Sequence, residues 1–466
     1  MRLILLSGGS GKRLWPLSND ARSKQFLKVL LNERGELESM VQRVWSQLES
    51  TGLGETSYIA TSKSQLDMIQ NQLGSDMKLI VEPERRDTFP AIALASTYLY
   101  SVEGVELDEV VVVLPVDPYV DESFFERVKG LEQILEDGLA DLALMGVVPT
   151  YPSEKYGYIV PEAGQMDHEV VKVSHFREKP TEEQAQKLIS QQAMWNCGVF
   201  AFKLGFVIAK IRELGFATDY EVLREHYGGL PKISFDYQVV EKTKDISALR
   251  YDGEWKDLGT WNTLTEEMSR ELIGNGIISE DSKNTHLVNE LDIPVTVLGL
   301  SNIVVAASPD GILVSDKGAS PRVKEVVSGL DHRPMFEERR WGWYKVLEHT
   351  TSPSGQEVLT KRIGIKAGKN LSYQMHYMRS EVWTIVSGTG EFVLDEIIYP
   401  VKAGDVVNIP VQAKHGIRAV SDLEFIEVQM GRALVEEDIV RLFMTWDEVE
   451  ERCVRRPILE VAEKPA

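Results

Sequence analysis

The sequence predicts an α/β fold for the first half of the chain and β structure for the second half, on three observations. Up to residue 114, short apolar runs alternate with amphipathic stretches of helical period. The run Glu109–Leu114 contains four consecutive valines, which is typical of a strand buried on both faces of a parallel sheet. After residue 268 the segments become short and alternating, with Gly and Pro between them. We therefore expect a mostly parallel sheet covered by helices, then a small all-β linker module, then a β-barrel or jelly roll.

Each element of this fold is predicted from its period and its flanking residues. The first half should contain strands at Arg2–Ser7, Ser57–Thr61, Lys78–Glu82 and Glu109–Leu114, and helices at Leu37–Leu48, Ser62–Leu73 and Thr88–Ser101. The second half should contain strands at Pro294–Leu300, Asn302–Ala306, Gln356–Ile365, Val382–Ser387, Gly390–Leu394, Val406–Ile409 and Glu424–Gln429. We expect Arg333–Arg340 to be a charged connector, Glu436–Phe443 a short closing helix and the last residues a tail. The predicted domains are 1–267, 268–335, 336–452 and a tail at 453–466.

The composition excludes several classes of function. The 466 residues include 51 Lys and Arg against 72 Asp and Glu, a formal charge of −21, and such an acidic chain repels the phosphate backbone of nucleic acids. The two cysteines, Cys197 and Cys453, predict neither a disulfide framework nor a CxxC metal motif. No stretch approaches the roughly 20 apolar residues of a membrane span, and the apolar N-terminal run is too short for a signal peptide. We expect a cytoplasmic protein without nucleic-acid or membrane partners.

A glycine-rich loop directly follows the first predicted strand, at Ser7–Leu14. Glycines let the backbone approach a phosphate closely, and consecutive backbone N–H groups form an anion cradle. A P-loop would need Gly in place of Leu6 and Ser or Thr in place of Arg13, and a dinucleotide fingerprint would need Gly in place of Leu14. A plain strand-to-helix turn is the alternative, but the nearby cations Arg13 and Lys24 favour phosphate binding.

The stretch Gly8–Ser18, followed by Ser23–Leu27, closely resembles the motif of sugar-1-phosphate nucleotidyltransferases, and more narrowly that of bacterial mannose-1-phosphate guanylyltransferases. Ser23 departs from the Pro that this family usually has. The resemblance spans nearly the whole chain and implies a Rossmann-like nucleotidyltransferase domain and a C-terminal cupin-like β-barrel. It implies that Gly8, Gly9, Ser10 and Gly11 bind the nucleotide and that Arg13 and Lys24 are catalytic. The implied partners are GTP and α-mannose 1-phosphate, which react to give GDP-mannose and pyrophosphate.

Two further motifs of the first half match this family. Glu82–Ala91 resembles its Glu-Pro-x-x-Arg-Asn-Thr-Ala-Pro-Ala segment, with Asp87 for the usual Asn and Phe89 for the usual Ala. The resemblance implies that Glu82, Arg86 and Asp87 contact the nucleotide, and a helix N-cap at Asp87 is the alternative. Asp117 follows the valine-rich strand, where Val116 and Pro118 depart from the family's Pro-Ser-Asp-His, and Asp257 lies in Trp-x-Asp-x-Gly-x-Trp. The resemblance implies that Asp117, also catalytic, and Asp257 bind Mg²⁺ as the cofactor; a turn residue is the alternative for either aspartate alone.

Three motifs on the sugar side complete the match. Tyr156–Ile159, Phe176–Pro180 and Trp195–Phe200 follow family patterns. The resemblance implies that Tyr156, Gly157, Glu178, Lys179 and Asn196 bind the sugar phosphate, with Glu178 and Asn196 on sugar hydroxyls and Lys179 on the phosphate. A solvated surface pair is the alternative for Glu178 and Lys179. We interpret a further matching segment, Ser234–Tyr237, as mainly structural support.

The second half carries an altered metal motif. Gln374–Trp383 resembles the Gln-x-His-x-His-Arg-x-Glu-His-Trp pattern of the isomerase domain of bifunctional relatives, but Met378 and Val382 stand at two of its histidine positions. We expect Gln374, His376, Glu381 and His415 to form at most a vestigial metal site. The chain also has Thr445–Asp447 where relatives have Asp-x-Tyr-Gly-Arg.

These departures predict a monofunctional transferase. The alternatives are an enzyme that also isomerises mannose 6-phosphate and fructose 6-phosphate, a transferase for another hexose 1-phosphate or base, and a sugar-nucleotide sensor without turnover. The aspartate pair argues against the sensor, because binding alone does not require two metal-binding carboxylates. A homodimer is a further expectation.

Overall fold

The structure is a computed structural model that describes all residues except 10, 20, 166–167, 331–332, 436–437 and 457–466. It consists of two compact units. Unit 1 comprises Met1–Ala306 and Ile312–Gly329, and unit 2 comprises Ala307–Gly311 and Leu330–Ala466. Among the described residues, no helix has both the length and the apolar character that crossing a membrane requires.

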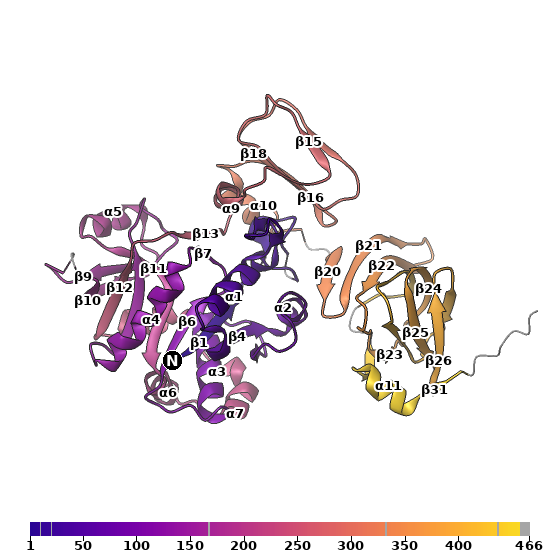
Figure 1. Ribbon diagram of the computed structural model, residues 1–466, viewed down its shortest axis with the longest axis horizontal. Coiled ribbons are helices and arrows are strands. Elements are labelled where there is room, and N and C mark those ends of the chain that lie inside the picture. Colours follow the sequence, from indigo (N-terminus) through magenta and orange to yellow (C-terminus); the bar gives the residue numbers. More distant parts are fainter. Residues whose placement is uncertain (10, 20, 166–167, 331–332, 436–437, 457–466) are drawn as a thin grey trace, which may run out of the picture. The chain divides into compact units, whose positions relative to one another are not determined.

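Unit 1 is built on a nine-stranded sheet (Figure 1). In spatial order its strands are β5 (Leu79–Glu82), β4 (Ser57–Ser62), β1 (Arg2–Ser7), β6 (Val110–Pro115), β11 (Met194–Lys203), β8 (Leu142–Val147), β12 (Ile246–Tyr251), β10 (Val170–Arg177) and β9 (Tyr158–Pro161). The neighbours from β5 to β6 are parallel, as are β8 and β12, whereas β11 runs antiparallel to β6 and β8. The four strands predicted in this half are confirmed as β1, β4, β5 and β6, each within one residue at either end.

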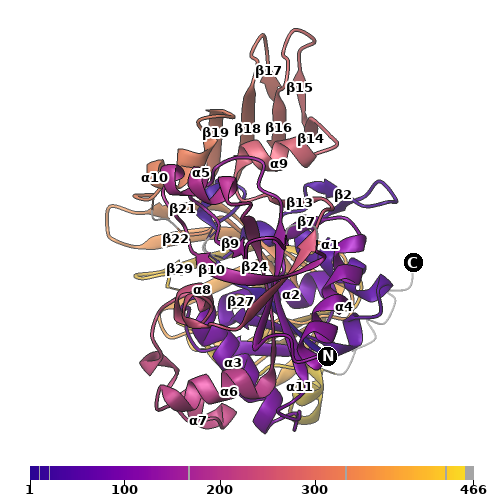
Figure 2. The same ribbon diagram turned by 90° about the vertical axis from the view of Figure 1, so that its left-hand side faces the viewer.

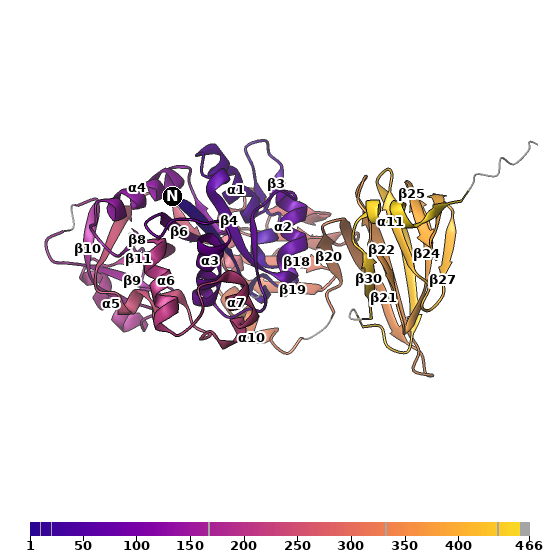
Figure 3. The ribbon, with the colours of Figure 1, turned by 90° about the horizontal axis from the view of Figure 1, so that it is seen from below.

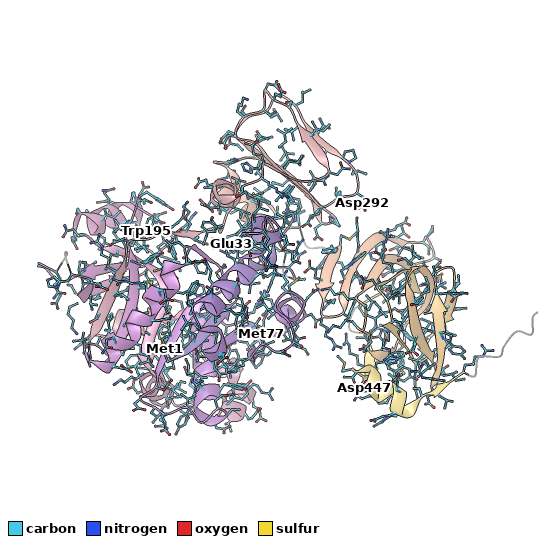
Figure 4. All side chains as sticks on the ribbon, in the orientation of Figure 1. Met1, Glu33, Met77, Trp195, Asp292 and Asp447 are labelled. Carbon is cyan, nitrogen blue, oxygen red and sulfur yellow. The ribbon has the colours of Figure 1, made fainter. Side chains whose placement is uncertain are left out.

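Helices cover both faces of this sheet, because successive side chains of each strand point to opposite sides. Leu3 and Leu5 share a core with α1 (Met40–Ser50), α2 (Leu66–Leu73), α4 (Ser123–Glu136) and α5 (Glu182–Ser190). Ile4, on the other face, shares a core with α3 (Thr88–Ser101), α6 (Leu204–Glu213), α7 (Tyr220–Glu225) and α8 (Phe235–Gln238). The labelled Met1 marks the amino end of the parallel strands and Trp195 the opposite end (Figure 4). The carboxyl ends of the parallel strands therefore lie together at one end of the sheet, where ligands bind in such folds.

The three helices predicted in the first half are present, and two of them begin later than predicted. The helix predicted at 88–101 is confirmed as α3. The helix predicted at 37–48 begins at Met40, because residues 37–38 form β3 (Leu37–Glu38) with β2 (Leu30–Leu31) and Ser39 forms a capping box with Gln42. The helix predicted at 62–73 begins with a 3₁₀ turn at Lys63–Gln65 before α2.

A small β module follows α9 (Trp261–Glu267) (Figure 2). β14 (Leu272–Gly274), β16 (His286–Asn289), β18 (Ile303–Ser308) and β19 (Gly311–Asp316) form one sheet, and β15 (Gly276–Ile278) pairs with β17 (Val295–Val297). Leu287, Val297 and Val305 form its small core, and α10 (Val323–Val326) ends it. Within the segment predicted at 294–300, Val295–Val297 form β17, and the segment predicted at 302–306 is confirmed as β18.

Unit 2 is a sandwich of two six-stranded sheets (Figure 3). One contains β20 (Phe336–Arg339), β21 (Gly342–Thr351), β22 (Glu357–Ile365), β29 (Leu423–Gly431), β24 (Arg379–Ser387) and β27 (Val406–Ile409). The other contains β30 (Val440–Phe443), β23 (Tyr373–Met375), β28 (His415–Ala419), β25 (Thr389–Leu394), β26 (Ile397–Lys402) and β31 (Val454–Arg455), and α11 (Trp446–Arg452) lies between β30 and β31 in the chain. The core includes Trp383, Phe392, Ile417 and Phe425. All five strands predicted in this domain are confirmed, with β24 beginning three residues early.

Three predictions for the second half are wrong. The expected connector at 333–340 contains β20, which pairs with residues 342–345 of β21 in a hairpin. Val440–Phe443 form strand β30 instead of the end of a helix, because β23 offers an edge that pairs with their backbone groups; residues 436–437 lie outside the described part of the chain. The expected tail at 453–466 begins with β31, which pairs with β26, and its residues 457–466 lie outside the described part.

Candidate active site

Two short strands bring the predicted metal-binding carboxylates together. Asp117 lies between the end of β6 and β7 (Pro118–Val120), at the edge of the sheet where the parallel strands end. β13 (Trp255–Asp257) pairs antiparallel with β7 and places Asp257 opposite Pro118. This pairing sets Asp257 beside Asp117 although the two are far apart in the sequence. A shared site therefore explains the pair better than two separate turns.

Lys24 joins the two carboxylates. Its Nζ lies 2.9 Å from Oδ2 of Asp117 and 2.7 Å from Oδ1 of Asp257. Burial acts to lower the pKa of Lys24, but the charges of both aspartates outweigh it and raise this pKa above its ordinary value. For Asp257 burial acts to raise the pKa, and Lys24 lowers it overall. One cation thus reaches both carboxylates, and because oxygen ligands are those that Mg²⁺ prefers, the pair fits the predicted ion.

The residues on either side of Lys24 hold the glycine loop. Ser23 Oγ donates to the carbonyl oxygen of Gly9 at 3.2 Å, and the Gln25 amide donates to that of Gly8 at 3.4 Å. These bonds hold two carbonyl oxygens of the loop in place, and backbone N–H groups of such loops are the donors that bind an anion. Ser23 replaces the family's usual Pro, and its hydroxyl makes a bond that Pro could not make.

Close packing explains why the last glycine of this loop cannot carry a side chain. A Cβ on Gly11 would lie 2.1 Å from the carbonyl oxygen of Asn19 and 3.0 Å from that of Arg22. Gly9 has a φ of +111°, in the region that favours glycine. The predicted residue Ser10 lies outside the described residues.

Two further cations act on Asp257. Arg13, predicted as catalytic, lies in a 3₁₀ turn after the loop and has an exposed side chain. Lys155 was not predicted. Each contributes, after burial and Lys24, to the lowered pKa of Asp257. Lys155 directly precedes the Tyr156-Gly157 motif, and that position was the available signal for it. In a chain of net charge −21 these cations are a local concentration of positive charge beside Asp257.

The predicted nucleotide-binding residues at the end of β5 and just after it make hydrogen bonds within the protein. Glu82 is buried and accepts a hydrogen bond of 2.6 Å from the Tyr227 hydroxyl, and burial raises its pKa. Arg86 donates through Nε and Nη2 to the carbonyl oxygen of Leu230. Asp87 is the N-cap of α3, has a φ of +77° and accepts from the next backbone N–H at 2.8 Å. The N-cap alternative for Asp87 is confirmed, and contact of these residues with a nucleotide stays a prediction.

Four of the five predicted sugar-side residues meet where β9 and β10 pair. The Lys179 N–H donates to the Tyr156 carbonyl oxygen at 3.2 Å. A Cβ on Gly157 would lie 2.6 Å from Oε2 of Glu178, so a larger residue there would displace this carboxylate. Glu178 is buried, and its Oε1 accepts from Lys179 Nζ at 2.7 Å. The alternative of a solvated surface pair is therefore wrong for Glu178.

Asn196 is the fifth predicted sugar-side residue. It contacts Gly157 and also Asp236, which lies in the segment that we interpreted as structural support. Its backbone N–H donates to the carbonyl oxygen of Gly157 at 2.8 Å, and its side-chain Nδ2 donates to Oδ1 of Asp236 at 2.9 Å. Its Oδ1 accepts from the N–H of Gly198 at 3.1 Å. Burial, and then the charge of Glu178, raise the pKa of Asp236 to about 7. Asp236 is thus a site carboxylate that sequence reasoning missed, although the segment at 234–237 signalled its neighbourhood.

In unit 2 the residues of the predicted vestigial metal site lie together inside the sandwich. His376, Glu381 and His415 are buried, and one ligand atom of each lies within 4.8 Å of the others. Nδ1 of His376 bonds to the carbonyl oxygen of Asp438, and Nδ1 of His415 to that of Ala413 at 3.0 Å. These bonds turn Nε2 of each ring toward the cluster, where Nε2 of His376 accepts from Arg379 Nη2 at 3.2 Å. Nε2 of His415 has no hydrogen-bond partner among the described residues, so the three donors fit a divalent metal.

Two polar side chains surround this cluster. Arg379 Nε lies 2.8 Å from Oε1 of Glu381, and its Nη2 lies 3.2 Å from Nε2 of His376. Gln374 Nε2 lies 3.4 Å from Nε2 of His376, so all four predicted residues are brought together. Burial lowers the pKa of His376 to about 4, and its ring is therefore neutral at pH 7.

Met378 and Val382, which replace two histidines of the family pattern, are less buried than the three clustered residues. Met378 is 45% exposed, and Val382 lies between the buried Glu381 and Trp383 on a strand whose side chains alternate between faces. Val382 therefore faces away from the cluster of His376, Glu381 and His415. The absence of a histidine at position 382 therefore removes no donor from that cluster.

Comparison with known proteins agrees with this geometry. The family model for nucleotidyl transferases matches residues 2–272. The mannose-1-phosphate guanylyltransferase of Salmonella muenchen is 30% identical over 94% of this chain and 97% of its own. The chain belongs to the mannose-1-phosphate guanylyltransferase family. The xanthan biosynthesis protein XanB of Xanthomonas campestris is 33% identical to the enzyme. The alignment covers 95% of this chain and 98% of the XanB chain.

Two further comparisons cover the separate units of the enzyme. A crystal structure from Thermus thermophilus, described as a mannose-1-phosphate geranyltransferase, is 29% identical, with a TM-score of 0.58, and covers 71% of this chain and 99% of its own. The family model for the mannose-6-phosphate isomerase C-terminal domain matches residues 330–443, within unit 2.

An aromatic pocket of the enzyme opens beside the aspartate pair. It has a volume of about 450 Å³, and Tyr156, Trp255 and Asp257 line it together with Tyr151 and Trp195. The rings of Tyr156 and Trp195 lie 4.9 Å apart between centroids, and those of Tyr156 and Trp255 5.5 Å apart. Burial, and then the charge of Asp257, raise the pKa of Tyr156, so its hydroxyl stays protonated at neutral pH.

Replacing Asp236 by Asn should change how the stability of the enzyme depends on pH. Folded Asp236 takes up a proton near pH 7, whereas the ordinary value is 3.8. Between these two pH values the folded state therefore binds more protons than the unfolded state. As the pH rises through this range, Asp236 consequently lowers the free energy of unfolding. Asn cannot ionise but still accepts the hydrogen bond from Asn196. Urea unfolding at pH 5 and pH 8 should show a smaller loss of stability at pH 8 for Asp236→Asn than for the wild type, and an equal loss would contradict this assignment.

Proposed function

We propose that the enzyme transfers GMP from GTP to α-mannose 1-phosphate, giving GDP-mannose and pyrophosphate. The observation that carries this proposal is the cluster of Asp117, Lys24 and Asp257, which lies at the carboxyl end of β6, with Ser23 and Gln25 on either side of Lys24 bonded to the glycine loop. Two carboxylates that bind one cation, beside a cradle for anions, suit a reaction that joins two phosphate compounds.

The chemistry requires positioning and charge neutralisation. A phosphate monoester has a second pKa of about 6, so the sugar phosphate oxygen that attacks the α-phosphorus of GTP is already ionised and needs no general base. The loop N–H groups and Arg13 would bind the β- and γ-phosphates, and Lys24 would offset charge at the α-phosphate. Asp117 and Asp257 would hold Mg²⁺, which supplies the charge that lets two anions approach. Pyrophosphate leaves in line with the attacking oxygen.

The sugar would bind between carboxylates and aromatic rings. A sugar hydroxyl donates hydrogen bonds, and the carboxyl oxygens of Glu178 and Asp236 can accept them. Asn196 would act mainly by orienting Asp236, since its Nδ2 already donates to that carboxylate and its Oδ1 accepts from Gly198. Lys179 and Lys155 would bind the sugar phosphate. The aromatic pocket beside Tyr156 offers apolar faces for a pyranose ring.

We further propose that this GDP-mannose serves polysaccharide synthesis in the cytoplasm. The basis is the similarity to XanB, a protein named for xanthan biosynthesis. A homodimer stays an expectation from the sequence.

The experiment that tests the transfer is a matrix of nucleoside triphosphates against hexose 1-phosphates, scored by pyrophosphate release. GTP with mannose 1-phosphate should give the highest kcat/KM. A higher value for another base or another hexose would contradict the proposed substrates and retain only the transfer chemistry.

Metal binding in unit 2 is a second candidate function, favoured by the three converging donors of His376, Glu381 and His415. We expect one Zn²⁺, Co²⁺ or Mn²⁺ ion per chain at this place, and His415→Ala should lose it in a metal titration. We expect no isomerisation of mannose 6-phosphate, because the isomerase segment expected at 445–447 is missing. Isomerisation that disappears on chelation and in His415→Ala would show that the enzyme is bifunctional.

A further inference from the structure

The ion triad of unit 1 contains a cation that belongs to the protein. The Lys24 side chain is 19% exposed, and its ammonium contacts one oxygen of each aspartate at 2.9 Å and 2.7 Å. An ammonium has three N–H donors, and two of them point at these carboxylates. The triad has two negative charges and one positive charge, so Lys24 neutralises half of the charge of the pair.

A metal ion held by both aspartates would compete with the ammonium for these carboxylates, because one oxygen of each already contacts Lys24 Nζ. Mg²⁺ binds carboxylate oxygens at about 2.0–2.1 Å and requires near-octahedral geometry. An ammonium within hydrogen-bond distance of both aspartates occupies the space between them, and its charge repels a divalent ion. Lys24 and a metal ion held by Asp117 and Asp257 therefore compete for this position.

We propose that Lys24 is the resident counter-ion of the aspartate pair, and that it is displaced when the metal enters with a nucleotide. This inference rests on the proposed function, because a substrate phosphate supplies the negative charge that draws the ammonium away. Lys24 then changes partners from carboxylates to phosphate without losing its ion pair. The enzyme in this state binds free metal weakly, and metal and nucleotide bind together.

A purely structural ion pair makes a different prediction. If Lys24 only stabilises the fold, removing its charge lowers stability without changing the affinity of the site for metal. If Lys24 competes with the metal, removing its charge leaves two uncompensated carboxylates, which then bind a divalent ion tightly without a nucleotide. Metal affinity in the absence of substrate separates the two cases.

The experiment compares Lys24→Met with Lys28→Met, the same substitution at an exposed position four residues away. Binding of Mn²⁺ without nucleotide is measured from the free-ion signal in electron paramagnetic resonance, and thermal unfolding is measured with and without Mn²⁺. Lys24→Met should bind Mn²⁺ about tenfold or more tightly than the wild type. Its Tm should fall without metal and rise again with Mn²⁺, whereas Lys28→Met should match the wild type.

Two more variants make the result specific. Adding Asp257→Asn to Lys24→Met should abolish the gain in Mn²⁺ affinity, because one of the two carboxylates is then neutral. If Lys24→Met does not fold, Lys24→Gln takes its place, since its amide keeps a hydrogen bond to a carboxylate without carrying charge. Mn²⁺ affinity equal to that of the wild type in the folded neutral variant would overturn the inference.

This outcome is separate from a failure of the proposed function. If the wild type releases pyrophosphate from GTP and mannose 1-phosphate but the neutral variants bind Mn²⁺ no more tightly, the counter-ion role is wrong and the function stands. If the neutral variants bind Mn²⁺ more tightly but the wild type lacks turnover, the counter-ion role stands and the function is wrong.

Discussion

Asp117→Asn and Asp257→Asn are each expected to reduce pyrophosphate release from GTP and mannose 1-phosphate by about 10²–10³-fold or more. Each change keeps the size of the side chain but removes one of the two charges that face Lys24 at 2.9 Å and 2.7 Å. The remaining carboxylate would bind Mg²⁺ alone, and the repulsion between the two phosphate substrates would no longer be offset. Lys24→Ala should reduce turnover comparably, since it removes the cation proposed to act at the α-phosphate. Steady-state pyrophosphate release at saturating Mg²⁺ measures these effects.

The matched control is Asp108→Asn, which makes the same change at an exposed position before β6. It should retain wild-type turnover, and far-ultraviolet circular dichroism should show that all four variants are folded. Near-normal turnover in either site aspartate variant would remove the proposed mechanism.

Gly11→Ala is expected to have the second large effect. A Cβ at this position would lie 2.1 Å from the carbonyl oxygen of Asn19, which is backbone and cannot move as a side chain does. The glycine loop would shift, and because misplaced donors lose most of their electrostatic effect, turnover should fall by about 10²-fold. Overpacking of this kind also lowers the free energy of unfolding by about 1–3 kcal/mol. Pyrophosphate release and the urea midpoint measure the two effects.

Gly8→Ala is the matched control for stability in the same loop. A Cβ there has no heavy atom within 4 Å in the structure, and the Gly8 backbone is not in the left-handed region. Its urea midpoint should stay that of the wild type. Equal stability of Gly8→Ala and Gly11→Ala would contradict the packing argument.

Local patterns predicted the scaffold of the site well. The four valines of β6 require a strand buried on both faces, and the period of residues 88–101 is that of the observed α3. The order of strands and helices places Asp117 after β6, at the carboxyl edge of the sheet. The motif match located Lys24 and Asp257, but the sequence could not show that Lys24 Nζ contacts both aspartates. That contact depends on the pairing of β7 with β13, which are distant in the chain.

The wrong predictions have a common cause, which is contact between segments that are distant in the sequence. Residues 440–443 have a pattern that a helix could share, and only the neighbouring edge of β23 makes them a strand. The outward position of Val382 depends on the register of β24, which spacing alone does not fix. Asp236 was overlooked because its contact with Asn196 joins two segments that the motif match treated separately.

The most direct test of the account is a crystal structure of the enzyme with Mn²⁺, a non-hydrolysable GTP analogue and mannose 1-phosphate. We expect an anomalous peak for Mn²⁺ within about 2.5 Å of carboxylate oxygens of both Asp117 and Asp257, with the phosphates on the loop N–H groups and Lys24 on a phosphate. A nucleotide bound away from the glycine loop, or Mn²⁺ bound away from both aspartates, would contradict the account.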